Sequence, residues 1–232
     1  MTDTLKRHWK LLVPAAVVLI GIACYAMTSP EPSYHGRTVS DWFSVIGAFS
    51  GPPNDPALPA IKAMGKDAVP FLMRQFKLSN SRWHNQMVNW GNRWLPLRTE
   101  IMPDSVRHNR AFHCLVNAGD QAEVAIPELI EMVRDPSTTK LGREDAIALL
   151  GNIHKQPEKT VPALIDSLYS ARDINTFTCI VLALEEFGTN AKPAAPVMIS
   201  LMRASAPGNW RHWIGGTIRT IDPVVARQAG IE

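Results

Sequence analysis

The sequence predicts an all-α fold, a solenoid of stacked helical hairpins that follows a single N-terminal transmembrane or signal helix. A unit with a fixed proline recurs four times in the body, and a run of 17 residues near the N-terminus carries no charge. The 24 Lys and Arg residues nearly balance the 21 Asp and Glu residues, and three of the basic residues precede the uncharged run. The body is therefore almost neutral and has little field with which to attract polyanions. A disulfide framework is also excluded, because 232 residues include only 3 Cys.

Residues 1–10 form a basic cytoplasmic segment that contains Lys6, Arg7 and Lys10, and residues 11–27 form the apolar run LLVPAAVVLIGIACYAM. As a helix this run would span about 26 Å, enough for a thin bilayer. The basic flank predicts a cytoplasmic N-terminus and an extracytoplasmic (periplasmic) body. Two alternatives stay open: a signal peptide cleaved near Ala26, which would release a secreted body, and a lipoprotein modified at Cys24.

The next elements are a linker over residues 28–37 and an N-terminal cap helix and loop over residues 38–56. Thr38 and Asp41 have the spacing of a capping box, and the helix that follows carries an apolar face. That face consists of Trp42, Phe43, Ile46 and Phe49. The Pro- and Gly-rich residues 51–56 are typical of a loop.

Residues 57–232 are expected to form the repeat array. Each unit has an apolar helix end, a break, a short polar run and a second apolar helix that opens on a small residue, an apolar residue and proline. The repeat prolines are 57, 35 and 34 residues apart, at Pro70, Pro127, Pro162 and Pro196. The break residue lies eight residues before the proline three times and five residues before it once, at Gly119, His154, Gly188 and Gly65 respectively.

Each part of the unit has a physical reason. Glycine at the break takes the left-handed conformation that ends a helix, and His154 predicts a less regular turn. Proline fits the first turn of the second helix, where no N–H is needed. Apolar stripes on these helices predict a core that includes Leu129, Leu164 and Leu182.

An insertion interrupts the array at about residues 79–105. It holds Trp83, Trp90 and Trp94, which fall on one stripe of a helix together with Met87 and Leu97. Three interpretations are open: an extra helix packed on the neighbouring hairpins, an aromatic binding surface, and insertion into a membrane surface.

A C-terminal cap is expected over about residues 209–232, with Asp222 as N-cap, Pro223 at the first helical position and Gly230 as the stop. Cys114 and Cys179 should lie on the first helices of hairpins that one further hairpin separates. We therefore expect two buried, reduced thiols and no bridge between them.

The unit resembles HEAT repeats, in the variety noted in phycobilisome lyases, over about residues 57–232. The flanks, Tyr34 to Trp42 and Ile221 to Gly230, resemble those of a group of exported bacterial HEAT-repeat proteins. The resemblance implies a right-handed α-solenoid that acts as an interaction scaffold, and it brings no catalytic residues.

Signals for catalysis are weak. His108 and His113 are five residues apart, which misses the spacing of a helical zinc pair, and Glu185 and Glu186 point in different directions on a helix. The common nucleophile-elbow and phosphate-binding motifs do not occur in the sequence. We expect no cofactor and no metal site.

The sequence thus predicts a membrane-tethered, extracytoplasmic interaction scaffold without catalysis of its own. Its partner would be a protein or peptide of the envelope rather than nucleic acid or a small molecule. The candidate partner-binding residues are Trp83, Trp90, Trp94, Arg134, Arg172 and Arg203. The alternative is an enzyme that uses the same groove, lyase-like toward tetrapyrroles or DNA-glycosylase-like.

Overall fold

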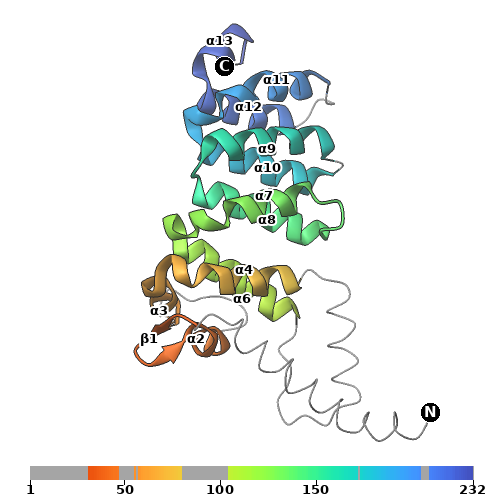
Figure 1. The fold of residues 1–232 in the computed structure, drawn as a ribbon. Helices are drawn as coiled ribbons and strands as arrows, with labels where there is room; N and C mark the ends of the chain where they lie inside the picture. The colour runs from red at the N-terminus through yellow and green to blue at the C-terminus, as the bar shows by residue number, and fades with distance from the viewer. Residues whose placement is uncertain are drawn as a thin grey trace, which may run out of the picture.

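A computed structural model describes residues 31–46, 55, 57–79, 104–171, 173–204 and 209–231 of the chain. The described part is almost entirely α-helical, and its helices stack along one direction from the N-terminal to the C-terminal side (Figure 1). The apolar run 11–27 lies outside the described residues. None of the helices that the structure describes is both long and apolar enough to cross a membrane.

The described chain begins with a small hairpin where the sequence predicted only a linker. Strands β1 (Ser33–Tyr34) and β2 (Arg37–Thr38) pair antiparallel through a turn in which His35 and Gly36 both have positive φ. Two consecutive residues with positive φ suit the tight turns that match strand twist.

Helix α2 (Val39–Val45) follows, and Thr38 and Asp41 form the predicted capping box. Arg110 fastens this helix to the stack, because its Nη1 donates to the carbonyl oxygens of Phe43 at 3.2 Å and Ser44 at 2.8 Å. Phe43 and Ile46 are buried and Trp42 is half-buried, as the predicted apolar face requires, whereas Phe49 lies outside the described residues.

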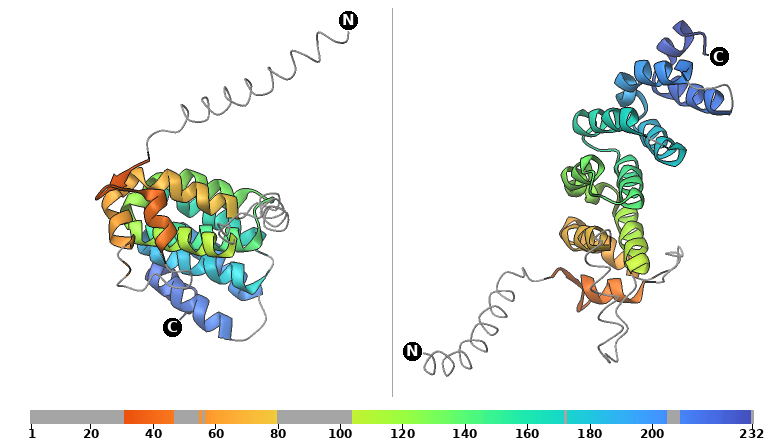
Figure 2. Two further views of the ribbon diagram at one scale, coloured as in Figure 1. Left: turned by 90° about the horizontal axis from the view of Figure 1, so that it is seen from below. Right: turned by 90° about the vertical axis from the view of Figure 1, so that its right-hand side faces the viewer.

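Consecutive helices of the described body fall into five pairs, and we call their members first and second helices. They are α3 (Ala57–Met64) with α4 (Val69–Ser79), α6 (Asp104–Ala118) with α7 (Ile126–Arg134), α8 (Lys140–Ile153) with α9 (Pro157–Ser170), α10 (Ile174–Glu186) with α11 (Ala195–Ala204), and α12 (Asn209–Ile221) with α13 (Pro223–Gln228). First helices contact first helices of the neighbouring pairs, as α6 does with α8, α8 with α10 and α10 with α12. Figure 2 shows the two kinds of helix as two columns.

Three of the turns inside these pairs have the predicted construction. Gly65, Gly119 and Gly188 take φ values of +67°, +55° and +51°, and each opens a short 3₁₀ helix. These 3₁₀ helices are η1 (Gly65–Asp67), η2 (Gly119–Ala125) and η3 (Gly188–Ala194). The repeat proline is then the second residue of α4, α7 and α11, where its missing N–H removes no helical hydrogen bond.

The turn between α8 and α9 departs from this construction. His154 and Gln156 both adopt left-handed φ values, 37° and 49°, and α9 begins at Pro157. The prediction that Pro162 starts the second helix is therefore wrong, because Pro157 takes the first position and leaves Pro162 inside the helix. An extra helical turn here replaces the 3₁₀ helix of the other units.

The core runs through the stack without a break among the described residues. Leu129 and Leu164 are fully buried, as predicted, but Leu182 is 48% exposed, so the prediction for Leu182 is wrong. The neighbours Val181 and Leu184 fill the core instead.

Both cysteines lie on first helices, Cys114 on α6 and Cys179 on α10, and both are free thiols. The pair α8 and α9 lies between their hairpins, as the repeat alignment predicted. Cys114 is fully buried, whereas Cys179 is only half-buried, so the expectation of two buried thiols holds for one of them.

Candidate functional site

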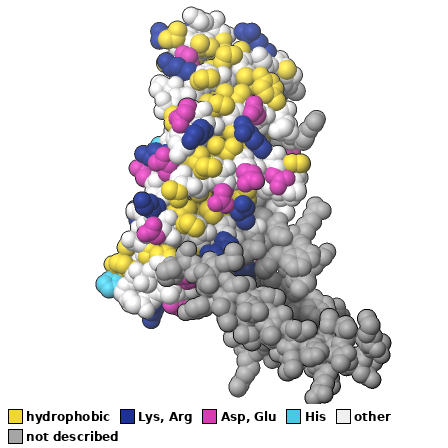
Figure 3. Space-filling view, viewed as in Figure 1, with side chains coloured by type: hydrophobic (Ala, Val, Ile, Leu, Met, Phe, Trp, Pro, Cys, Tyr) yellow, Lys and Arg dark blue, Asp and Glu magenta, His cyan; other side chains and the backbone are white. Residues whose placement is uncertain are grey.

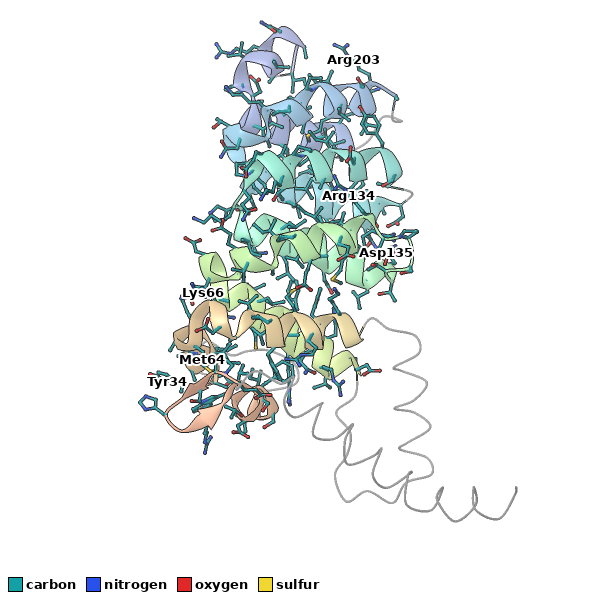
Figure 4. All side chains as sticks on the ribbon, in the orientation of Figure 1. Tyr34, Met64, Lys66, Arg134, Asp135 and Arg203 are labelled. Carbon is teal, nitrogen blue, oxygen red and sulfur yellow. The ribbon has the colours of Figure 1, made fainter. Side chains whose placement is uncertain are left out.

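Two of the six predicted partner-binding residues belong to the described chain. Arg134 is the last residue of α7 and Arg203 lies in the last turn of α11, and both are exposed. Figure 4 shows them on the same side of the stack, at the ends of second helices. Trp83, Trp90, Trp94 and Arg172 lie outside the described residues.

The alignment of the units reveals a recurrent surface position. Seven residues after each repeat proline stands an exposed cationic or aromatic residue, and we call this set the second-helix column: Lys77, Arg134, Tyr169 and Arg203. Tyr169 is 69% exposed, an unusual exposure for a large aromatic side chain. Sequence reasoning singled out the two arginines, but it passed over Tyr169 and Lys77.

Ion pairs link neighbouring second helices along this column. Lys77 Nζ lies 3.2 Å from Glu128 Oε2, and Arg134 Nη2 lies 3.3 Å from Asp166 Oδ2. All four side chains are at least 44% exposed, so the pairs add little stability and remain open to exchange with another anion. Arg203 has no ion pair or hydrogen bond within the described part of the chain.

Apolar side chains accompany the charges on this face. Ile130, Ile165, Val197 and Leu201 are half-buried on successive second helices. In Figure 3, which views the second helices, hydrophobic groups run along the stack between side chains of both signs. Such a mixture of apolar centre and charged flanks is typical of surfaces that bind proteins.

A second feature is a pocket of about 390 Å³ between the first helices α6 and α8. At its base His108 Nε2 forms a hydrogen-bonded pair with Asp145 Oδ2, and the His108 ring stacks on Phe76 with 4.9 Å between centroids. The pocket is lined by Ser105, Val106, His108, Asn109, Phe112, His113, Leu141 and Asp145. Because His108 and Asp145 are 37 residues apart, no local pattern links them.

Another pocket, of about 500 Å³, lies at the edge of the stack where the turns of successive pairs meet. Met64, Gly65 and Lys66 line it from one turn, Gln121 and Val124 from the next, as Figure 4 shows for Met64 and Lys66. A Cβ at Gly65 would lie 2.6 Å from Gln121 Oε1, so a side chain there would displace the end of the Gln121 side chain.

The acidic and metal-ligating side chains singled out in the sequence can be placed where the structure describes them. Among the described residues no three His, Cys, Asp or Glu side chains are grouped to hold a metal ion. Glu185 accepts a hydrogen bond from Thr217 at 2.9 Å, which ties α10 to α12, whereas Glu186 is exposed. The two carboxylates therefore do not converge, in agreement with their predicted directions.

The described fold defines an all-α protein of stacked helices with one mixed, partly apolar face. Comparison of the chain with protein-family models, with curated proteins and with solved structures finds no match. The likeness to HEAT repeats therefore rests on the residues of this chain.

Proposed function

We propose that the protein is a membrane-tethered, extracytoplasmic interaction scaffold built as a right-handed, HEAT-like α-solenoid. Residues 11–27 would anchor it, residues 1–10 would stay in the cytoplasm, and the body would hold a protein or peptide partner of the envelope. The partner would bind across the second helices.

The recurrent turn supports the HEAT-like part of the proposal. A left-handed glycine, a 3₁₀ helix and a proline at the second helical position recur in three pairs. The later repeat prolines are 35 and 34 residues apart, a period close to that of helical-hairpin repeats. Stacked repeats of this kind create extended binding surfaces.

The observation that carries the proposed function is the second-helix column. Three cationic residues and one strongly exposed tyrosine stand seven residues after the repeat proline on four successive second helices, beside half-buried apolar groups. Tyrosine and arginine are the residues that most often dominate the binding energy of protein interfaces.

Site-specific photocrosslinking tests this proposal. A photoreactive residue at Tyr169, on the second-helix face, should form discrete adducts with one envelope protein in the native membrane. The matched control is a photoreactive residue at Leu182, which is also exposed but lies on the first helix α10. Equal adducts at both positions, or none at Tyr169, would overturn the proposed face, and the variant Arg134→Glu should weaken the adduct at Tyr169.

A further inference from the structure

We propose that the pocket between α6 and α8 binds a primary alkylammonium group, such as a lysine side chain. This site goes beyond the proposed function, because it lies between first helices and shares no residue with the second-helix column. Its volume, about 390 Å³, falls within the range of small ligand pockets.

The charge of the pocket favours a cation. Among the described residues that line it, Asp145 is the one acidic residue, with a side chain that is 24% exposed, and none is Lys or Arg. His108 Nε2 shares a hydrogen bond with Asp145 Oδ2, which holds the carboxylate in place at the pocket. Lys140, one turn earlier on α8, does not neutralise Asp145, because its Nζ lies 2.9 Å from Asp173 and 3.7 Å from Glu144.

The thiol of Cys179 on α10 lies close enough to Asp145 for the carboxylate to affect its pKa. Burial raises the pKa of Cys179, and the carboxylates of Glu144, Asp145 and Asp173 raise this pKa further. All three acids belong to the neighbouring helices α8 and α10 or to the N-cap of α10.

The walls of the pocket suit an alkyl chain. Phe112, Leu141 and Val106 contribute apolar surface, and Leu141 is 57% exposed at the rim. The methylene stem of a lysine buries such surface while its ammonium reaches a polar group. The ring of Phe112, with His113 edge-on at 5.7 Å, offers a π face to the approaching cation.

The geometry at Asp145 also selects ammonium over guanidinium. Oδ2 already accepts the hydrogen bond of His108, and stacking on Phe76 holds the His108 ring in place. Oδ1 has no hydrogen-bond partner among the described residues. One available oxygen satisfies the compact ammonium group, whereas a guanidinium needs two for its paired contact with a carboxylate.

Titration of the full-length chain in a non-ionic detergent tests the site. The probes are n-butylammonium, n-butylguanidinium and n-butanol, and the readout is the NMR signal of ¹³C-labelled histidine rings. We expect saturable shifts of the His108 and His113 signals with n-butylammonium, weaker binding of n-butylguanidinium and no saturation with n-butanol. Equal responses to n-butylammonium and n-butanol would overturn the proposal.

Two variants and one control sharpen the test. Asp145→Asn should weaken n-butylammonium binding roughly tenfold or more, because it removes the charge from the hydrogen bond. Leu141→Lys places a competing cation at the rim and should also weaken binding. Because Leu141 is exposed, this variant should fold. The control Asp166→Asn removes an exposed carboxylate of α9 and should leave binding unchanged. Unchanged binding in Leu141→Lys would overturn the proposal even if Asp145→Asn fails to fold.

The source of the ammonium is distinguished by a further probe, N-acetyl-lysine methylamide. Binding as tight as that of n-butylammonium indicates a lysine of a protein partner. If the pocket binds n-butylammonium but not N-acetyl-lysine methylamide, the natural ligand is a small free amine. Failure of both probes would overturn the site while leaving the crosslinking test of the second-helix face unaffected.

Discussion

At the scale of single residues, the two described cysteines differ in chemistry because their burial differs. Burial raises the pKa of the Cys114 thiol to about 12, and the nearby carboxylate of Asp55 adds to the rise. Cys179 is half-buried, and its pKa is also raised, first by burial. The reactive species of a cysteine is the thiolate, so access and pKa together determine the rate of modification.

We therefore predict that a thiol reagent at pH 8 labels Cys179 at least tenfold faster than Cys114 in a Cys24→Ser background. Cys114 should react only after denaturant is added, as mass spectrometry of the labelled peptides would record. Equal rates would contradict the burial of Cys114.

The raised pKa of Cys114 also predicts how stability depends on pH. Above the ordinary thiol value, the unfolded chain has lost a proton that the folded chain retains. The free energy of unfolding should therefore fall as pH rises from about 9 to about 12, and less so in Cys114→Ala. Urea denaturation at several pH values, with both proteins side by side, measures this difference.

At the scale of elements, proline has two different positions in the second helices. Pro127 is the second residue of α7, whereas Pro162 is the sixth residue of α9. A proline inside a helix removes one backbone hydrogen bond and crowds the preceding turn, but a proline at the start does neither. The repeat proline therefore costs a helical hydrogen bond in α9 but not in α7.

We predict that Pro162→Ala raises the free energy of unfolding by about 1 kcal/mol or more, because an N–H at position 162 can donate to the carbonyl of Glu158. The matched control Pro127→Ala should change it by less than about 0.5 kcal/mol, or lower it, since no helical hydrogen bond is gained there. Chemical denaturation of the two variants checks this, and identical effects would contradict the observed start of α9.

At the scale of the whole molecule, the stack depends on contacts between successive pairs. Arg110 ties the cap helix α2 to α6, Glu144 accepts a hydrogen bond from Thr176 of α10 at 2.9 Å, and Glu185 accepts one from Thr217 of α12. Each of these bonds joins a first helix to a neighbouring unit. Together with the continuous apolar core they hold the body as one stack.

Membrane localisation is a prediction for the whole chain. The full-length protein should remain in the membrane fraction after carbonate washing, and protease added to spheroplasts should degrade the body, because residues 11–27 predict an anchor with an outward body. A variant that lacks residues 11–27 should be lost from the membrane fraction. A mature N-terminus at Met27 would contradict the anchor, and a protected body would contradict export.

Features that depend on neighbours a few positions away could be predicted from the order of the amino acids. The capping box of Thr38 and Asp41, the N-cap at Asp222 and the left-handed Gly119 each follow from local hydrogen bonds and backbone sterics. Helical periodicity likewise predicted that Leu129 and Leu164 are buried. The helical fold and its pairwise order could be predicted for the same reason.

Packing between helices determines which helix faces are covered and which distant side chains meet, and local sequence patterns do not contain this information. Periodicity alone does not distinguish Leu182 from Val181, and Leu182 is exposed because the adjacent first helices cover the other sides of α10. Pro157 and Pro162 are both able to begin a helix, and the left-handed turn at His154 and Gln156 selects Pro157. The pair His108 and Asp145 exists because α6 and α8 pack together. The two residues are 37 positions apart, so the packing of hairpins brings them together and local preference does not.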